Sequence, residues 1–187
     1  MPKRIDHLHE DILAASREIL LKSGYESLTM RAVAGRCRIA VGTLYNYYSS
    51  KDQLAASVML ADWQAIMADT ADRCRDAETL QQGLEILHDG VRRFSDLYEE
   101  VWRCYRDFKG SRIEIAARHT LLVSQMAECL SPLIARTVRN APEDLDLFLA
   151  ENVLRCGSGG AVSFESFLKI VDALIRAEEE ARRERES

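Results

Sequence analysis

Apolar side chains recur three or four positions apart along most of this chain, and that spacing limits what it can fold into. In residues 80–108 the pattern lasts for about eight helical turns and consists of Leu80, Leu84, Leu87, Val91, Phe94, Val101, Tyr105 and Phe108. A helix places such positions on one face, whereas a strand would require alternation. Only Pro2, Pro132 and Pro142 interrupt the chain, so we expect an all-α fold.

Capping residues predict where the helices begin and end. Gly24 and Gly110 are suited to end helices, because glycine readily adopts positive φ. Ser50 with Gln53, and Thr79 with Gln82, have capping-box spacing. About nine helices are expected, including residues 30–37, 41–48, 51–73, 80–108, 111–139 with a kink at Pro132, 143–156 and 163–184.

The net charge of −5 is unevenly distributed. Up to Lys51 the chain has eight Lys and Arg against five Asp and Glu, a balance of +3, which leaves −8 for the remainder. A basic first segment on an acidic body indicates two functions, one of which is binding to a phosphate backbone. We therefore expect one domain over residues 1–51 and a larger one over 52–187.

Several classes of protein are disfavoured by what the sequence lacks. No apolar run approaches the roughly 18 residues that cross a bilayer, and the start MPKRIDHLHEDI has no signal-peptide core, so a cytoplasmic protein without a membrane partner is expected. The five cysteines have no C-x-x-C spacing, which argues against a disulfide framework or a metal site. No nucleophile and base at motif spacing and no phosphate-binding glycine loop are present. We expect no enzymatic activity and no cofactor.

Residues 28–54, LTMRAVAGRCRIAVGTLYNYYSSKDQL, predict two short helices joined by a tight turn and followed at once by a capped helix. This segment resembles the DNA-binding segment of the tetracycline-repressor (TetR) family, in which a pattern like T-x-R-x-[IV]-A-x-x-x-G-V-S-x-G-T-[LI]-Y-x-[HY]-F-x-[SN]-K-x-x-L recurs. The agreeing positions are Thr29, Arg31, Val33, Ala34, Gly42, Thr43, Leu44, Tyr45, Tyr47, Ser50, Lys51 and Leu54. Two positions depart from it: Arg38 replaces the usual turn glycine, and Ala40 replaces a serine or threonine cap.

The resemblance implies an N-terminal helix-turn-helix domain that binds double-stranded operator DNA. Base edges would be faced by Val41, Gly42, Thr43, Tyr45 and Asn46, with a phosphate contact as the alternative for Asn46. Phosphates would be contacted by Thr29, Tyr47 and Lys51, and either a base or a phosphate by Arg31. Leu44 and Tyr48, four residues apart, are expected to face the small core instead.

For the body, the resemblance implies a small-molecule effector and a homodimer formed by the last two helices. Candidate effector-binding residues are Trp63, Trp102, Tyr105 and Phe108, with ordinary core packing as the alternative. Candidate dimer residues are Phe148, Leu149, Val153, Phe164, Phe167, Leu168, Val171, Leu174 and Ile175, with packing inside one chain as the alternative.

The leading hypothesis is a transcriptional regulator that binds a palindromic operator as a dimer, in most cases a repressor, and that an effector releases from DNA. Activation stays open. A second hypothesis is an α-helical ligand-binding or small enzymatic protein whose first three helices are only a packing module. A rival sensing mode is oxidation of Cys74 or Cys104.

Overall fold

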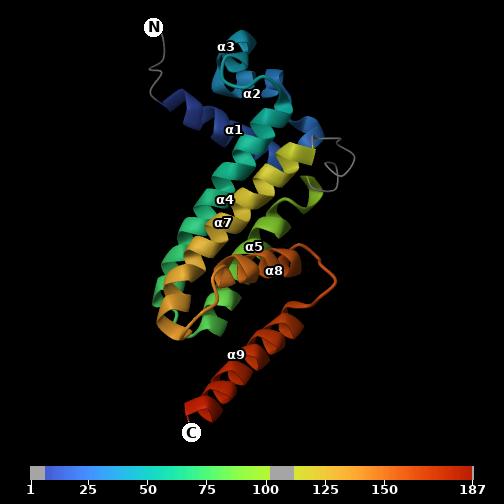
Figure 1. Cartoon of the computed structure of the whole chain (residues 1–187). Helices are drawn as coiled ribbons and strands as arrows, with labels where there is room; N and C mark the ends of the chain where they lie inside the picture. The colour runs from blue at the N-terminus through green and yellow to red at the C-terminus, as the bar shows by residue number, and fades with distance from the viewer. Residues whose placement is uncertain (1–6, 102–111, 187) are drawn as a thin grey trace. The chain divides into compact units, whose positions relative to one another are not determined.

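The computed structural model describes residues 7–101 and 112–186, and within these ranges the chain is helical, with no strand (Figure 1). The predicted all-α fold is confirmed. The elements are α1 (Leu8–Ser23), the 3₁₀ turn η2 (Tyr25–Ser27), α2 (Met30–Cys37), α3 (Val41–Tyr45), α4 (Lys51–Asp76), α5 (Leu80–Leu97), α7 (Arg112–Thr137), α8 (Leu145–Gly157) and α9 (Phe164–Glu186). None of these helices combines the length and the apolar composition that crossing a bilayer requires.

The described residues divide into two compact units. One contains residues 7–65 and 96–101, and the other contains residues 66–95 and 112–186. Helix α4 contributes to both, up to Ala65 in the first and from Ile66 in the second. The predicted functional boundary after residue 51 stays a prediction, because compactness does not report which residues bind DNA.

Helices α1, α2 and α3 and the first turns of α4 build the core of the first unit. The buried side chains there include Ile12, Ile19, Leu20, Leu28, Val33, Ala34, Leu44, Tyr48, Leu54 and Val58. On α1, Leu8 and Ala15 are half-buried, whereas Ser16 and Leu20 are buried. Ser16 is tolerated in the core because its hydroxyl donates to the carbonyl of Ile12 at 2.6 Å.

Side-chain caps set the starts of α2 and α4. Thr29 Oγ1 accepts the amide of Ala32 at 3.1 Å, and α2 covers the predicted residues. Ser50 Oγ accepts the amide of Gln53 at 3.1 Å. Gln53 Oε1 in turn accepts the amide of Ser49 at 2.6 Å, one residue earlier than a standard capping box.

Helix α3 is shorter than its sequence predicts, ending at Tyr45 rather than Tyr48. Beyond Tyr45 the amides of Asn46 and Tyr47 bond to carbonyls three residues back, at 3.2 and 3.0 Å. Bonds of that span tighten the chain into a 3₁₀-like turn. The recognition segment is therefore a short helix followed by a turn.

Helix α5 also ends early, at Leu97, although one helix was expected over residues 80–108. Tyr98 lies in a turn with 0% of its side chain exposed, and helical backbone resumes at Glu99. Apolar spacing continues across this one-residue interruption, so periodicity does not reveal it. The remainder of the expected helix, from residue 102, lies outside the described residues.

In the second unit, the C-terminal part of α4 packs against α5. Arg73 pairs with Asp89 at 2.9 Å and Arg93 with Asp69 at 2.7 Å. Gly90 permits close approach, since a Cβ there would lie 2.6 Å from Thr70 Oγ1.

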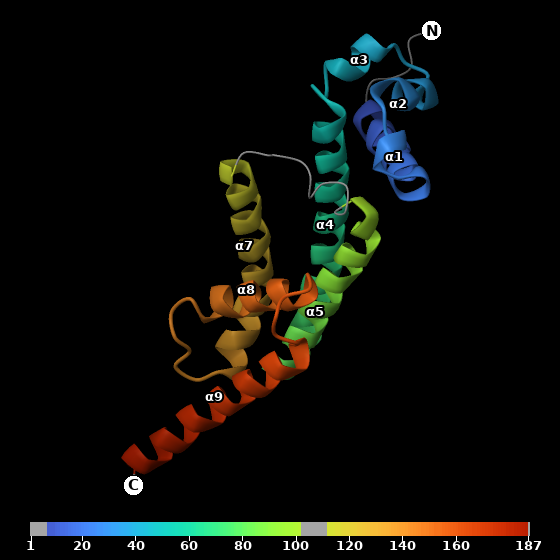
Figure 2. The same cartoon turned by 90° about the vertical axis from the view of Figure 1, so that its right-hand side faces the viewer.

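Helices α7, α8 and α9 complete the second unit, and both views show α8 lying against α7 (Figures 1 and 2). Helix α8 begins at Leu145, two residues later than predicted, because Asp144 adopts left-handed backbone with φ 63°. On α9, Phe167 and Val171 are buried while Ile170 and Leu174 are exposed.

Candidate nucleic-acid interface

Three tyrosines of the recognition segment take different environments. Tyr48 is 4% exposed, whereas Tyr45 and Tyr47 are 53% and 38% exposed. The Tyr48 hydroxyl lies 2.9 Å from His9 Nε2 of α1, and burial raises the pKa of this phenol. Leu44, one helical turn before Tyr48, is 0% exposed. The predicted core pair is confirmed, and it fixes which face of α3 points outward.

The outward face of α3 bears the residues predicted to read bases. Gly42, Tyr45 and Asn46 are exposed, and Val41 and Thr43 are half-buried. A Cβ built on Gly42 would meet nothing within 4 Å, so packing inside the chain does not require glycine there. A glycine on an open face leaves room for a close external contact.

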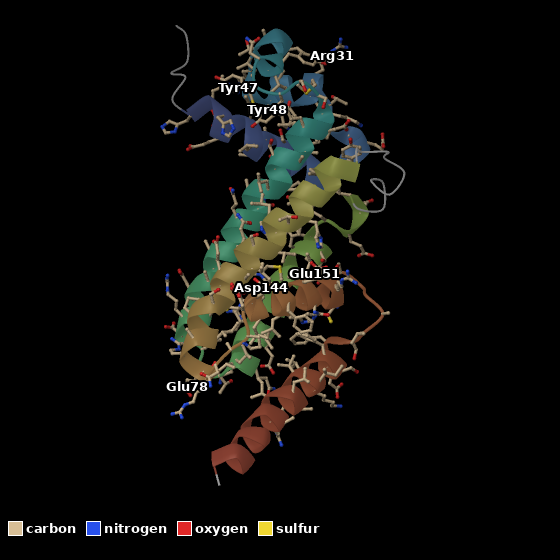
Figure 3. All side chains as sticks on the ribbon, in the orientation of Figure 1. Arg31, Tyr47, Tyr48, Glu78, Asp144 and Glu151 are labelled. Carbon is tan, nitrogen blue, oxygen red and sulfur yellow. The ribbon has the colours of Figure 1, made fainter. Side chains whose placement is uncertain are left out.

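The residues predicted to contact phosphates lie at the edges of this face. Arg31 on α2 is exposed, and in Figure 3 its side chain extends away from the helices. The hydroxyl of the exposed Thr29 serves as the α2 cap and retains its own proton to donate. Lys51 Nζ lies 4.3 Å from the centre of the Tyr25 ring. It also lies 3.9 Å from the carboxylate of Glu26.

These contacts position the Lys51 ammonium at the start of α4, with the side chain 34% exposed. A cation over an aromatic face is held in place without being neutralised. Tyr25 itself is buried, and its hydroxyl bonds to Asp52. The sequence motif pointed to Lys51 but gave no signal for the Tyr25 ring beneath it.

The turn between α2 and α3 departs from the family pattern as predicted. Arg38 has φ 56° and ψ 44°, the left-handed conformation that a glycine would adopt more readily. That conformation costs a non-glycine residue about 1 kcal/mol. Ala40 precedes α3 without a side-chain cap, so only its backbone carbonyl accepts, from the amides of Thr43 and Leu44 at 3.0 and 3.4 Å.

A charged network missed by sequence reasoning connects three segments of the first unit. Arg17 Nε of α1 lies 2.8 Å from both carboxylate oxygens of Asp62 on α4. The hydroxyl of Tyr98 donates to Asp62 at 2.7 Å, and burial raises the pKa of this phenol strongly. The partners are 45 and 36 residues apart, a separation at which local patterns give no signal.

Of the four predicted effector residues, only Trp63 lies among the described residues. Trp63 is 1% exposed and forms part of the core. Trp102, Tyr105 and Phe108 lie outside the described residues. Elsewhere an open hollow of about 500 Å³ on α4 and α5 is lined by Arg73, Asp76, Ala77, Gln82, Glu85 and Ile86. Its lining is largely charged and polar, and it contains none of the predicted aromatic residues.

Burial makes the thiols of three described cysteines, Cys74, Cys129 and Cys156, less reactive. Burial, and more weakly the nearby Cys129, raises the pKa of the Cys74 thiol to about 11. Burial raises the pKa of Cys129 as well. Thiolate is therefore scarce at neutral pH, which disfavours oxidation sensing at Cys74. Cys104 lies outside the described residues. Within the described residues, no group of three or more His, Cys, Asp or Glu side chains could hold a metal ion.

Helix α2 is capped, a left-handed turn follows it, and α3 is a short helix with one exposed face, and all three pack on a common core. This arrangement defines a helix-turn-helix DNA-binding domain. A family model described as bacterial regulatory proteins of the tetR family matches residues 12–58. The match places a DNA-binding domain of the TetR family at residues 12–58 of this chain.

Known relatives and structures agree with this family. The repressor KstR of Mycobacterium tuberculosis is 31% identical over 147 residues, which are 76% of this chain and 64% of KstR. The regulator UidR of Escherichia coli is 26% identical over 153 residues, 81% of this chain and 67% of UidR. The match thus spans about two thirds of either relative.

Among solved structures, a TetR-family regulator of Streptomyces coelicolor has a TM-score of 0.55 at 20% sequence identity. The match covers 91% of this chain and 96% of that one. At this identity the likeness supports the shared helical fold.

Proposed function

We propose that this protein is a transcriptional repressor that binds a two-fold symmetric DNA operator as a homodimer and leaves it when a small molecule binds. The observation that carries the proposal is the division of α3 into two faces. Leu44 and Tyr48 anchor the segment in the core, while Gly42, Tyr45 and Asn46 are exposed. A short helix with that division can enter a major groove without disturbing its own packing.

Within this proposal, α3 reads bases and its neighbours bind the backbone. Thr43 offers a methyl group suited to a thymine methyl, and Asn46 an amide suited to adenine. Thr29, Arg31, Tyr47 and Lys51 supply hydroxyl groups and cations suited to phosphate oxygens. The first group should determine sequence preference, and the second should determine affinity for any duplex.

The homodimer is proposed from apolar side chains left in solvent on α8 and α9. Phe148 on α8 and Ile170 on α9 are each 53% exposed, and Leu174 is 59% exposed. Ile170 and Leu174 are one turn apart and form a second apolar face beside the buried Phe167 and Val171. Two copies pairing these faces around a two-fold axis would bury them and present two α3 helices to successive major grooves.

The effector is proposed to bind beside Trp63, with Trp102, Tyr105 and Phe108 as further walls. Trp63 and Trp102 are the two tryptophans of the chain, so intrinsic fluorescence reports directly on this site. A ligand that binds there should change the emission of the wild-type protein, and Trp63→Phe should remove part of that change. An effector that releases DNA without altering tryptophan emission would contradict the assignment.

The proposal is tested by fluorescence anisotropy with labelled DNA from the region upstream of the gene. We expect specific binding that weakens steeply as salt rises, because phosphate contacts release counterions. An unrelated duplex of equal length is the control and should bind at least a hundredfold more weakly. Equal binding to both duplexes, or none at low salt, would refute the proposed function.

A further inference from the structure

Arg38 has a backbone conformation that its residue type does not favour. The described residues with positive φ are Gly24, Arg38, Asn140, Asp144 and Gly159. Glycine, asparagine and aspartate tolerate the left-handed region, so Arg38 is the one member of this set that does not suit it. Its amide and that of Ile39 bond back to Gly35 and Ala34 at 3.2 and 3.0 Å, as a helix-terminating turn requires. The turn therefore favours glycine, yet the chain has arginine.

No contact within the described residues accounts for the guanidinium of Arg38. The side chain is exposed, and no hydrogen bond or ion pair is formed by it there. Other arginines of the first unit differ: Arg17 pairs with Asp62 at 2.8 Å, and Arg36 pairs with Glu18 at 2.7 Å. Among the described residues of this unit, Arg31 is the other exposed arginine without such a partner, and it is already proposed to contact DNA.

The surroundings of Arg38 suit an anion. Between Leu28 and Lys51 the chain has four Lys and Arg and no Asp or Glu. Arg38 lies in the turn between α2 and α3, three residues before α3 begins at Val41. In a helix-turn-helix the first helix crosses the DNA backbone and the second enters the groove, so their turn lies at the groove edge. A side chain that leaves the turn is closer to phosphates than to base edges.

We propose that Arg38 contacts a DNA phosphate and adds affinity that does not depend on sequence, replacing the turn glycine at some expense in folding stability. This inference rests on the proposed DNA-binding function. The planar guanidinium of Arg38 can bind two phosphate oxygens at once, which a glycine cannot do. Stability and DNA affinity should therefore respond to substitution at this position in opposite directions.

Four variants separate charge from backbone conformation. Arg38→Gly removes the cation and suits the backbone; Arg38→Ala removes the cation and keeps the unfavourable backbone; Arg38→Lys keeps both the cation and the unfavourable backbone. Arg36→Gln is the matched control, because it removes a nearby exposed arginine that is already paired with Glu18. Each protein is titrated against the upstream duplex and an unrelated duplex at several salt concentrations, and its Tm is measured.

We expect Arg38→Gly and Arg38→Ala to bind both duplexes about five- to tenfold more weakly, with the log K against log salt slope reduced in magnitude by about 0.9. Arg38→Lys should retain most of the affinity, and Arg36→Gln should change it less than about twofold. The Tm of Arg38→Gly should rise by about 2–4 °C, which excludes unfolding as the cause of weaker binding.

Wild-type affinity and salt slope in Arg38→Gly would overturn this inference while leaving the proposed function intact. A loss confined to the upstream duplex would overturn the phosphate assignment. A wild-type protein that binds neither duplex would refute the proposed function itself.

Discussion

The α2–α3 surface and the outer faces of α8 and α9 differ in the large side chains that they expose. Around α3 the exposed groups are polar, cationic or aromatic hydroxyl groups, with Tyr45, Asn46 and Arg31 among them. On α8 and α9, aliphatic and phenyl groups such as Phe148 and Leu174 are exposed beside charged residues such as Lys169. The first surface suits a hydrated, negatively charged duplex, and the second suits a copy of itself. In the proposed function, one chain thus separates recognition of DNA from self-association.

The largest expected effect is the difference in folding stability between a variant at a buried position of α3 and a variant at an exposed position. Leu44→Ala should destabilise the protein by about 2–5 kcal/mol, because it leaves a cavity in the small core of the first unit. Tyr45→Ala, at the neighbouring exposed position, should change stability by less than about 0.5 kcal/mol while weakening DNA binding. Urea unfolding and anisotropy measure both quantities. Equal destabilisation by both variants would contradict the two-faced description of α3.

The next effect concerns self-association through α9. Ile170→Asp places a charge on the exposed apolar face twice per symmetric dimer, and should raise the dimer dissociation constant about 100-fold or more. Lys169→Ala, on the same helix at an exposed site, is the control and should leave it within about threefold. Sedimentation velocity gives the distribution of monomer and dimer. A dimer that survives Ile170→Asp unchanged would place the interface elsewhere.

The smallest expected effect is a pH dependence within the second unit. The His88 ring stacks on Phe164 with centroids 3.8 Å apart, and burial, with Arg92 adding to it, lowers the pKa of His88. Since the folded pKa lies below the unfolded value of about 6.5, the folded state favours neutral imidazole. This stabilisation is complete above about pH 6.5 and is lost as pH falls through the folded pKa.

Substituting His88→Phe keeps the ring stack and removes the titration. Between pH 7 and pH 5 the wild-type Tm should fall by more than that of the variant, by a degree or two, when both are measured by circular dichroism. Parallel pH profiles for the two proteins would show that His88 does not contribute to acid sensitivity.

Local chemistry explains which features were predictable from sequence. The bounds of α2 depend on residues within a few positions and were predicted correctly. The Thr29 cap and the left-handed backbone of Arg38, where the family pattern has a glycine, are equally local. The core pair Leu44 and Tyr48 followed from helical spacing alone. These features require no knowledge of distant segments.

Features set by distant residues were missed. The break of the long helix at Tyr98 coincides with a buried hydroxyl that donates to Asp62, 36 residues away. The exposed Ile170 on α9 was absent from the predicted dimer residues, since the apolar pattern of an amphipathic helix does not distinguish a face packed inside the chain from one left in solvent.

The central claim is that α3 reads bases while the residues around it bind the DNA backbone. Its most direct test measures the affinity of Asn46→Ala, Thr43→Ala and Lys51→Ala for the upstream duplex and for duplexes with single base changes, each across a range of salt. Lys51→Ala should weaken binding about fivefold on every duplex and reduce the magnitude of the salt slope by about 0.9, whereas the two α3 variants should alter base preference and leave the slope unchanged. Equal losses on all duplexes for all three variants would contradict the claim.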